Sequence, residues 1–192
     1  MIKELIKGIV SIIAFILLLP LFILHVLHII NFFTVAQILS VLPGNLGFIF
    51  RRVWYKCTLA KCGRNFTIDF MGWVRSPKTT VGDNVYVGVN SWVGLADIGD
   101  DVMISGSVLV LSGSAQHGIK RLDVPMRVQE GKVERVSIGR DCWIGAGAII
   151  HADVADHSVV GCGSIVTRKF APFDVLAGVP AKKIKSRKGG VA

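Results

Sequence analysis

The sequence is short of acidic residues and of cysteine, and both shortages narrow what the protein can be. Its 192 residues hold 13 Asp and Glu against 22 Lys and Arg, a net charge of +9. Such an excess favours partners that carry phosphates or an anionic membrane surface. The four cysteines form no CxxC pair and have no ligand-like spacing with histidine: Cys57, Cys62, Cys142 and Cys162. We therefore expect small buried thiols in a reducing compartment.

Motifs for nucleic-acid binding are also missing. The sequence has no zinc finger, no RNA-binding aromatic motif and no basic helix. Positive charge alone does not make a nucleic-acid module, so we expect no nucleic-acid partner.

Residues 8–24 contain no charge, and the apolar run continues past His25 and His28 to Phe33. This exceeds the roughly 18 to 20 residues that cross a bilayer core. A signal peptide is disfavoured, because the run is too long and no small-residue cleavage site follows it. Pro20 leaves two readings, a kinked span or a re-entrant hairpin. The alternative to a membrane segment is a buried helix of an oligomer.

A second apolar stretch, residues 32–50, is interrupted by a turn signal at 42–45 and is typical of an interfacial helix. Basic residues then follow beside Trp54 and Tyr55: Arg51, Arg52, Lys56, Lys61 and Arg64. Basic residues beside aromatics suit a lipid headgroup region and bias it to the cytoplasm, as do Lys3 and Lys7 at the start. We predict that residues 1–56 are membrane-embedded or interfacial, with His25 and His28 near the interface.

From residue 81 an aliphatic residue recurs every six positions, usually followed by glycine. The repeats include Val81-Gly82, Val87-Gly88, Val93-Gly94, Ile138-Gly139, Ile144-Gly145 and Val160-Gly161. Strands of a sandwich would alternate with a period of two, whereas a six-residue period predicts a parallel β-helix built from stacked three-sided coils. We assign residues 57–80 to a connector and first irregular coil, because Ile68 and Val74 keep the period, and residues 81–181 to the β-helix.

The repeats stop near Ser114 and resume at Val136, which defines a loop at 115–137. Insertions at the corners of a solenoid often carry function. A lone histidine is usually structural, but His117 stands at the repeat break, between Ser-Gly-Ser and glycine, which favours a catalytic role. His151 and His157 fall on regular coils, and we expect them at the surface.

Several of these segments resemble the hexapeptide-repeat acyltransferases. They are the break around Ala115-Gln116-His117-Gly118, the run at 138–148, and the endings at 160–168 and 177–184. The branch is that of the galactoside, maltose, serine and xenobiotic O-acetyltransferases, and the likeness covers roughly residues 66–186. The apolar segment resembles a subgroup associated with exopolysaccharide and O-antigen synthesis. The resemblance implies a left-handed parallel β-helix, a homotrimer with active sites between coils, acetyl-CoA as co-substrate and no metal.

The resemblance also assigns residue roles. His117 would be the general base that removes the proton of an acceptor hydroxyl, a task that suits an imidazole; the group that fixes its tautomer is not identified. The donor would be bound by small residues, by cations and by an aromatic side chain: Trp143, Ala146, Cys162, Thr167, Arg168, Lys182 and Lys185. Cys162 replaces a common alanine. The sugar-binding Asn and Asp of the galactoside enzymes have no clear match, with Asn90 and Asp97 as the nearest candidates. Residues 182–192 are expected to form a basic tail.

The predicted function is transfer of an acetyl group from acetyl-CoA to a hydroxyl of a sugar in lipid-linked glycan, exopolysaccharide or O-antigen synthesis. The site would face the cytoplasm at a bacterial inner membrane, with membrane lipid and a saccharide acceptor as partners. The alternatives are a xenobiotic or antibiotic O-acetyltransferase and a non-catalytic membrane-docked trimeric scaffold. A zinc enzyme of the γ-carbonic anhydrase kind is disfavoured, because it needs three histidines and the loop has no second one: Leu122 stands five residues beyond His117.

Overall fold

The computed structural model describes residues 2–113 and 115–189, with side chains from residue 8 onward. Three helices come first: α1 (Ile2–Val26), α2 (Phe32–Ser40) and α3 (Gly44–Thr58). Short strands then form three sheets, which we call face A, face B and face C. Face A holds β1 (Lys61–Cys62), β4 (Thr80–Val81), β7 (Ala96–Ile98) and β10 (Val136–Ile138). Face B holds β2 (Thr67–Ile68), β5 (Tyr86–Val87), β8 (Met103–Ile104), β11 (Trp143–Ile144), β13 (Val159–Val160), β15 (Asp174–Ala177) and β16 (Lys182–Ser186). Face C holds β3 (Trp73–Val74), β6 (Trp92–Val93), β9 (Leu109–Val110), β12 (Ile149–Ile150) and β14 (Ile165–Val166).

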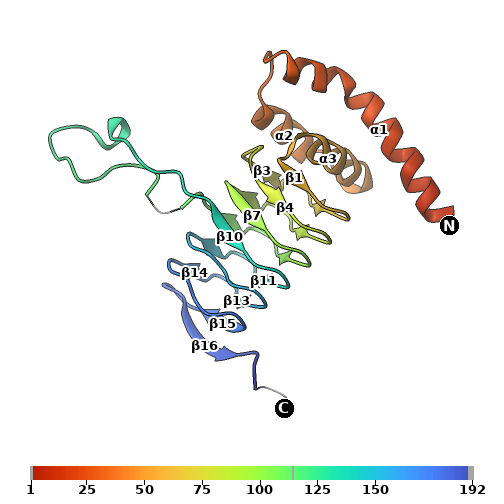
Figure 1. Ribbon diagram of the computed structural model, residues 1–192. Helices are drawn as coiled ribbons and strands as arrows, with labels where there is room; N and C mark the ends of the chain where they lie inside the picture. The colour runs from red at the N-terminus through yellow and green to blue at the C-terminus, as the bar shows by residue number, and fades with distance from the viewer. Residues whose placement is uncertain (1, 114, 190–192) are drawn as a thin grey trace.

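From β1 to β14 consecutive strands lie on different faces, so the chain winds as a three-sided coil (Figure 1). Paired residues are 19 positions apart between the first two coils, as in Ile68 and Val87, 17 apart in the next step, as in Val81 and Ile98, and 16 apart after the loop, as in Ile144 and Val160. The repeated aliphatic side chains are buried in columns inside the coil. The prediction of a mainly β protein built as a parallel β-helix is confirmed.

The glycines of the repeat are required by the approach of the next coil. A Cβ on Gly82 would lie 2.7 Å from the backbone nitrogen of Asp100, and one on Gly99 would lie 2.7 Å from that of Arg140. The left-handed backbone occurs two residues after the repeat glycine, at Asn84, Asp101 and Asp141, with φ of 57°, 59° and 49°. Asparagine and aspartate tolerate this conformation better than other non-glycine residues.

Helix α1 is continuous through Pro20, so the chain does not reverse there and a hairpin centred on Pro20 is wrong. The helix packs along α3 through Ala14, Leu18 and Phe22, and it exposes its other side (Figure 1). From Gly8 to Val26 it is long and apolar enough to cross a membrane, and 11% of that window is buried within the structure.

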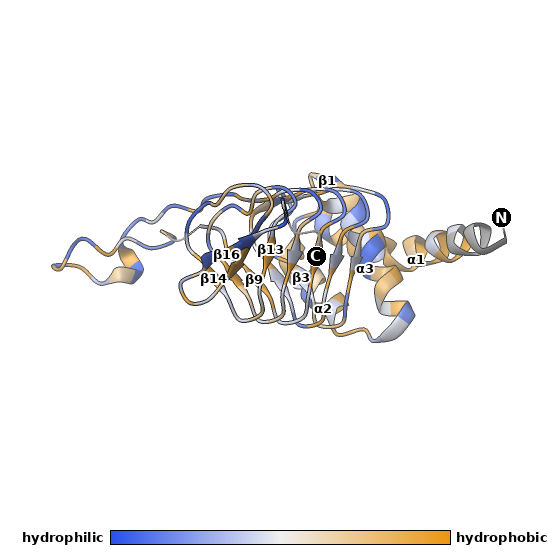
Figure 2. Ribbon diagram, turned by 90° about the horizontal axis from the view of Figure 1, so that it is seen from below, coloured by the Kyte–Doolittle hydropathy of each residue, from blue (hydrophilic) through white to orange (hydrophobic). Residues whose placement is uncertain are grey.

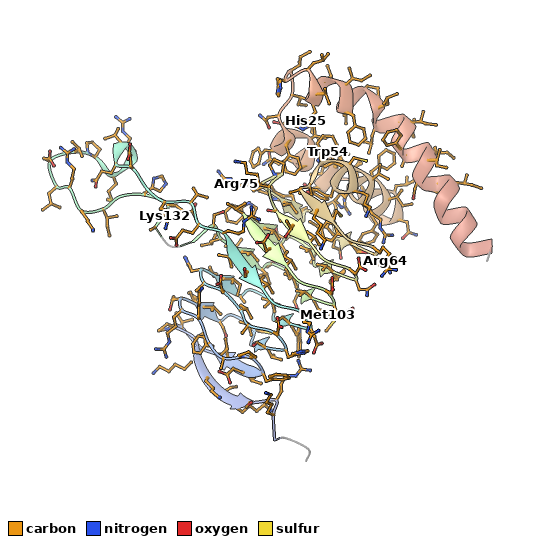
Figure 3. The ribbon with its side chains drawn as sticks, viewed as in Figure 1. His25, Trp54, Arg64, Arg75, Met103 and Lys132 are labelled. Atoms are coloured by element: carbon orange, nitrogen blue, oxygen red, sulfur yellow. The ribbon has the colours of Figure 1, made fainter. Side chains whose placement is uncertain are left out.

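Arg51, Trp54 and Tyr55 are each fully buried, so their predicted headgroup position is wrong. Helix α3 packs on the first coil and turns these side chains inward, where Trp54 stacks on Phe22 at 5.0 Å (Figure 3). The Arg51 guanidinium donates to carbonyl oxygens at 2.7–3.3 Å, those of Leu39, Ser40, Leu42 and Ile68. Burial lowers the pKa of Arg51; the carbonyls bind its Nε and Nη1, while its Nη2 is buried without a hydrogen-bond partner in the described part of the chain. It thereby ties the end of α2 to β2.

The loop between β9 and β10 projects from one side of the solenoid, and α1 extends from the other. Figures 1 and 2 agree on this arrangement, seen from directions 90° apart. The solenoid therefore separates an apolar helix from an exposed loop.

Candidate functional site

The loop that carries His117 is held together at its base. The backbone N–H of Lys132 donates to the Ala115 carbonyl, and Glu134 donates to Ser112 at 2.9 Å, which closes the two ends of the loop. Further out, the Gln129 amide donates to the carbonyls of Arg121 and Val124 at 2.7 and 3.0 Å. The loop is thus an ordered extension with one short 3-10 turn, Met126–Val128.

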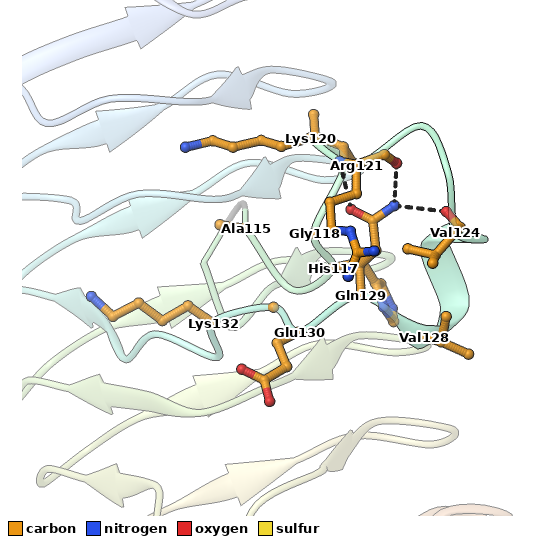
Figure 4. Close-up of a pocket in the computed structure, with 12 residues that line it drawn as sticks. Ala115, His117, Gly118, Lys120, Arg121, Val124, Val128, Gln129, Glu130 and Lys132 are labelled. Atoms are coloured by element: carbon orange, nitrogen blue, oxygen red, sulfur yellow. Dashed lines mark hydrogen bonds between the residues drawn. The ribbon is translucent and has the colours of Figure 1, made fainter.

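His117 is exposed and lines an open pocket of about 830 Å³ (Figure 4). Lys120, Glu130 and Lys132 line the same pocket, so charged groups of both signs lie around the imidazole. Within the described residues, which leave out Ser114, the ring has no hydrogen-bond or ion-pair partner. The imidazole can therefore contact a group supplied from outside its own loop.

A row of small residues lies at the corner between faces B and C. Ala146 and Cys162 are exposed there on adjacent coils, joined by a 2.8 Å bond from the Gly163 N–H to the Ala146 carbonyl. Asn90 stands on the same corner two coils before Ala146, and its amide lies 3.4 Å from the Ser107 hydroxyl. The glycines that follow Ala146 and Cys162 have left-handed backbone, with φ of 70° at Gly147 and 66° at Gly163. The B–C corner is therefore a path along the coils that carries mainly small side chains.

Lys182, the first residue of β16, lies at the end of this path. The chain crosses the top of face C, where the Ala181 N–H donates to the Ile165 carbonyl, and returns antiparallel to β15 as β16. The expected tail at 182–192 is therefore a strand over its first five residues, Lys182–Ser186. Lys182 and Lys185 are exposed on it, while Lys183 pairs with the buried Asp174 at 2.6 Å. Trp143 is half exposed on face B, and its indole N–H donates to Ser105 at 3.2 Å.

The remaining candidate site residues lie at other positions on the solenoid. Thr167 and Arg168 follow β14 at the corner between faces C and A, the corner from which the His117 loop leaves. Thr167 lines a pocket of about 600 Å³ at the loop root with His151, Asp153 and Lys132. Asp97 lies on face A and accepts hydrogen bonds from Thr80 at 2.5 Å and Arg135 at 2.6 Å. One copy of the chain thus brings Ala146, Cys162 and Lys182 together, and separates them from His117.

Charges at the loop root are paired. Burial raises the pKa of Asp153, but hydrogen bonds from Lys169 and from the Ser137 N–H outweigh it and hold the pKa below its ordinary value. Asp153 therefore stays ionised at neutral pH and fixes Lys169 beside Thr167.

Comparison with known proteins agrees with this architecture. A family model described as the hexapeptide repeat of succinyl-transferase matches residues 78–111 and 135–168, on either side of the loop. Galactoside O-acetyltransferase of Escherichia coli K12 is 32% identical over 132 residues, which are 62% of this chain and 63% of that protein. The chain is thus similar to the hexapeptide-repeat acyltransferases on both sides of the loop, over less than two thirds of the length of this relative.

Other known proteins match over smaller parts or at lower identity. Chloramphenicol acetyltransferase of Morganella morganii is 42% identical over 53 residues, 27% of this chain and 25% of that protein. The structure of a maltose O-acetyltransferase from Clostridium difficile 630 has a TM-score of 0.70, covering 80% of this chain and 83% of that one, at 22% identity, which shows the fold. AntD, an N-acyltransferase from Bacillus cereus in complex with dTDP and coenzyme A, has a TM-score of 0.57 at 25% identity, covering 66% and 73%.

Two histidines outside the loop are less exposed than predicted. His151 is half buried at the loop root, and its Nδ1 is buried without a hydrogen-bond partner in the described part of the chain. His157 bonds to Asp141 at 2.9 Å and stacks on Phe173 at 4.6 Å. The hydrogen bond from His157, followed by that from Arg187, lowers the pKa of Asp141. Both thus lie at the surface as expected but are only partly exposed, because corner residues of successive coils stack on one another.

Two of the four cysteines are buried or half-buried, and two are exposed. Burial raises the pKa of Cys62 and of Cys142 to about 11, so these thiols are inert. Cys57 and Cys162 are exposed, so the prediction of buried thiols is wrong for them. Among the described residues no group of three or more His, Cys, Asp or Glu could hold a metal ion.

Proposed function

We propose that the chain is an acyl-CoA-dependent O-acyltransferase that moves an acetyl group from acetyl-CoA to a hydroxyl of a sugar. The observation that carries the proposal is the single break in the solenoid, which holds His117 exposed in an open pocket between two matched blocks of hexapeptide repeat. Galactoside O-acetyltransferase, at 32% identity, supports the O-acetyl transfer and a sugar acceptor. AntD in complex with coenzyme A supports the donor.

His117 would act as general base in a direct transfer. The acceptor oxygen attacks the thioester carbonyl carbon, a C–O bond forms, and the hydroxyl proton moves to the imidazole. Collapse of the tetrahedral intermediate breaks the C–S bond, and the imidazolium returns the proton to the departing thiolate. The reaction needs no other co-reactant, and one histidine can serve both transfers.

The donor would lie along the B–C corner. A path of small residues at Ala146 and Cys162 lets a pantetheine chain approach the backbone, which large side chains would prevent. Lys182 at the end of that path, and Lys185 on the same strand, would meet the phosphates, which charge-assisted hydrogen bonds favour. Trp143, half exposed on face B, would line the same region.

A second copy of the chain would complete the site. The loop projects away from its own coil (Figure 1), and its root leaves the C–A corner, whereas the small residues occupy the B–C corner. Packing copies side by side would bring the His117 loop of one onto the B–C corner of the next. We therefore propose a homotrimer with sites between copies, in which the neighbour supplies the group that orients the imidazole.

A pocket beside the loop root supports a saccharide acceptor. It has a volume of about 390 Å³ and is lined by Arg75, Trp92, Ser112 and Gln116. Gln116 precedes His117 in the chain, so this pocket adjoins the proposed base. Trp92, with the Arg75 guanidinium over its ring at 5.6 Å, would offer apolar surface beside the hydrogen-bonding groups that a sugar needs.

The helical cap suggests where the acceptor is delivered. The exposed apolar side of α1 would place residues 1–56 at a membrane, with the solenoid and its catalytic loop on the cytoplasmic side. A lipid-linked saccharide would then reach the site from the bilayer surface. Exopolysaccharide or O-antigen synthesis would supply such an acceptor.

The direct experiment is thiol release from acetyl-CoA by the purified chain and by His117→Ala, against lipid-linked and free saccharides, with CoA binding measured in parallel. We expect turnover by the wild type, and CoA binding without turnover by the variant. A fully active variant would overturn the role of His117. Absence of CoA binding by either protein would replace the enzyme with a membrane-docked scaffold.

Antibiotic acetylation is a second candidate, because chloramphenicol acetyltransferase of Morganella morganii matches 53 residues at 42% identity. Adding chloramphenicol to the acceptor panel tests it. Turnover of chloramphenicol at a rate above that of every saccharide would favour this function.

A further inference from the structure

Helix α3 divides its cations between two environments. Arg51 points into the core, whereas Arg52 and Lys56, one helical turn apart, lie on another side of the helix and are half exposed and exposed. Together with Arg64 of the first coil they line a groove of about 560 Å³ between α1, α3 and that coil. Figure 3 shows Arg64 at the edge of the coil that faces α1.

The cations of this groove are only partly compensated. Arg64 pairs with Asp83 through two bonds of 2.9 and 2.7 Å. Arg52 donates to the Asn65 side chain at 3.2 Å, and Lys56 donates to the Cys62 carbonyl at 2.5 Å, so both keep neutral partners. No carboxylate is among the described residues that line the groove. Arg52 and Lys56 therefore leave net positive charge at one wall.

The opposite wall is apolar and belongs to α1. Ile12 and Phe15 line it and are 62% and 43% exposed. Ile16, at 59%, extends this surface along the same helix beyond the groove. Burying such side chains against hydrocarbon stabilises the arrangement by about 25 cal/mol per Å² of apolar surface. The groove thus combines a cationic wall with an apolar one that continues onto the exposed side of α1.

We propose that this groove binds an acidic phospholipid of the bilayer, with the phosphate between Arg52 and Lys56 and an acyl chain along Ile12 and Phe15. A free phosphate would satisfy the cations and leave the apolar wall in water, whereas a phospholipid covers both. The bound lipid would fix α1 and the end of the solenoid at the headgroup level. The proposal assumes the membrane association proposed above but not the transfer reaction.

Flotation of the full chain with vesicles tests the site. Vesicles of phosphatidylcholine are compared with vesicles that also contain phosphatidylglycerol, for the wild type, for Arg52→Gln/Lys56→Gln and for a control of equal charge loss on the loop, Lys120→Gln/Arg127→Gln. We expect the groove variant to lose about tenfold or more of the preference for phosphatidylglycerol. It should still bind phosphatidylcholine vesicles through α1, and the control should keep the preference.

Equal losses in the groove and loop variants would mean diffuse attraction of a basic protein, and would overturn the site. Displacement of the protein by inorganic phosphate at constant ionic strength would mean that the cations bind phosphate alone, which also overturns it. Native mass spectrometry from neutral detergent gives an independent readout: the wild type should retain phosphatidylglycerol, and the groove variant should not. Thiol release by the groove variant in detergent should match the wild type, which separates failure of the lipid site from failure of the proposed reaction.

Discussion

The two parts of the candidate site are built in opposite ways. The B–C corner is close-packed backbone: a Cβ on Gly145 would lie 2.6 Å from the nitrogen of Cys162, so the path beside Ala146 has one shape. The loop of His117 stands away from the coil and is closed by a few hydrogen bonds, chiefly those of Gln129 and the backbone pairs at its base.

This difference separates two tasks. A corner lined by small side chains can hold a long flexible donor by its backbone but carries no imidazole or other general base. The loop carries the imidazole, lines an open pocket of about 830 Å³ and adjoins the Trp92 pocket. Substitutions on the loop side should therefore change turnover or acceptor binding, and substitutions at the corner should change donor binding.

Removing the imidazole should have the largest effect. We expect His117→Ala to lower kcat by about 10²–10⁴-fold, the usual contribution of a general base, with the Kd for CoA unchanged. Steady-state kinetics and calorimetric CoA binding measure both quantities. His151→Ala is the matched control at the loop root. Equal losses in the two variants would contradict a specific role for His117.

Filling the B–C corner with a large side chain should have the second-largest effect. Ala146→Trp places a large ring on the small-residue path, and we expect about a 100-fold loss of kcat/KM for acetyl-CoA, since displacing a bound reactant by about 1 Å can cost that much. Ala171→Trp, at another exposed alanine, is the control. Normal CoA binding by the corner variant would rule out this path for the donor.

Neutralising the cations at the end of the path should have a smaller effect. Lys182→Ala/Lys185→Ala removes two exposed charges from β16, and we expect CoA binding to weaken about tenfold, because hydrogen bonds to charged groups contribute about 1.5–3 kcal/mol when desolvated and less when exposed. The loss should shrink at high salt. Lys120→Ala, on the loop, should leave CoA affinity unchanged.

Trp92→Ala should have the smallest effect on the donor and act on the acceptor instead. We expect the KM for the saccharide to rise roughly fivefold, about 1 kcal/mol, which is the usual contribution of one aromatic contact. The KM for acetyl-CoA should stay constant. Initial rates at varied acceptor and fixed donor decide this, and a change confined to the donor KM would refute the assignment of the pocket.

The solenoid could be predicted because its information is local and repeated. Val81, Val87 and Val93 recur at the spacing that the coil requires, and each repeat makes the same backbone contacts with the next. The helical cap has no such period. Arg51 can be buried because backbone carbonyls of α2 and β2 accept its hydrogen bonds. These carbonyls lie up to 17 residues away in the chain, so the local sequence does not show whether Arg51 lies in a headgroup layer or in a core.

The candidate site could be predicted in its residue types but not in its grouping. The sequence places His117 at the repeat break and small residues after Trp143, yet it does not say that the break leaves the C–A corner while Ala146 lies at the B–C corner. That follows only from counting strands around the three faces. The half-buried positions of His151 and His157 were missed for a related reason, since corner residues 16 apart stack on one another.

The central claim is that the active site forms between copies of the chain, and mixing two inactive variants tests it most directly. His117→Ala keeps an intact B–C corner, and Ala146→Trp keeps an intact loop. If copies share sites, unfolding and refolding the two variants together should restore a measurable part of the wild-type thiol release, while neither variant alone recovers. If mixed oligomers form, as mass spectrometry would show, and no activity returns, each copy must build its own site and the proposal of a shared site is wrong.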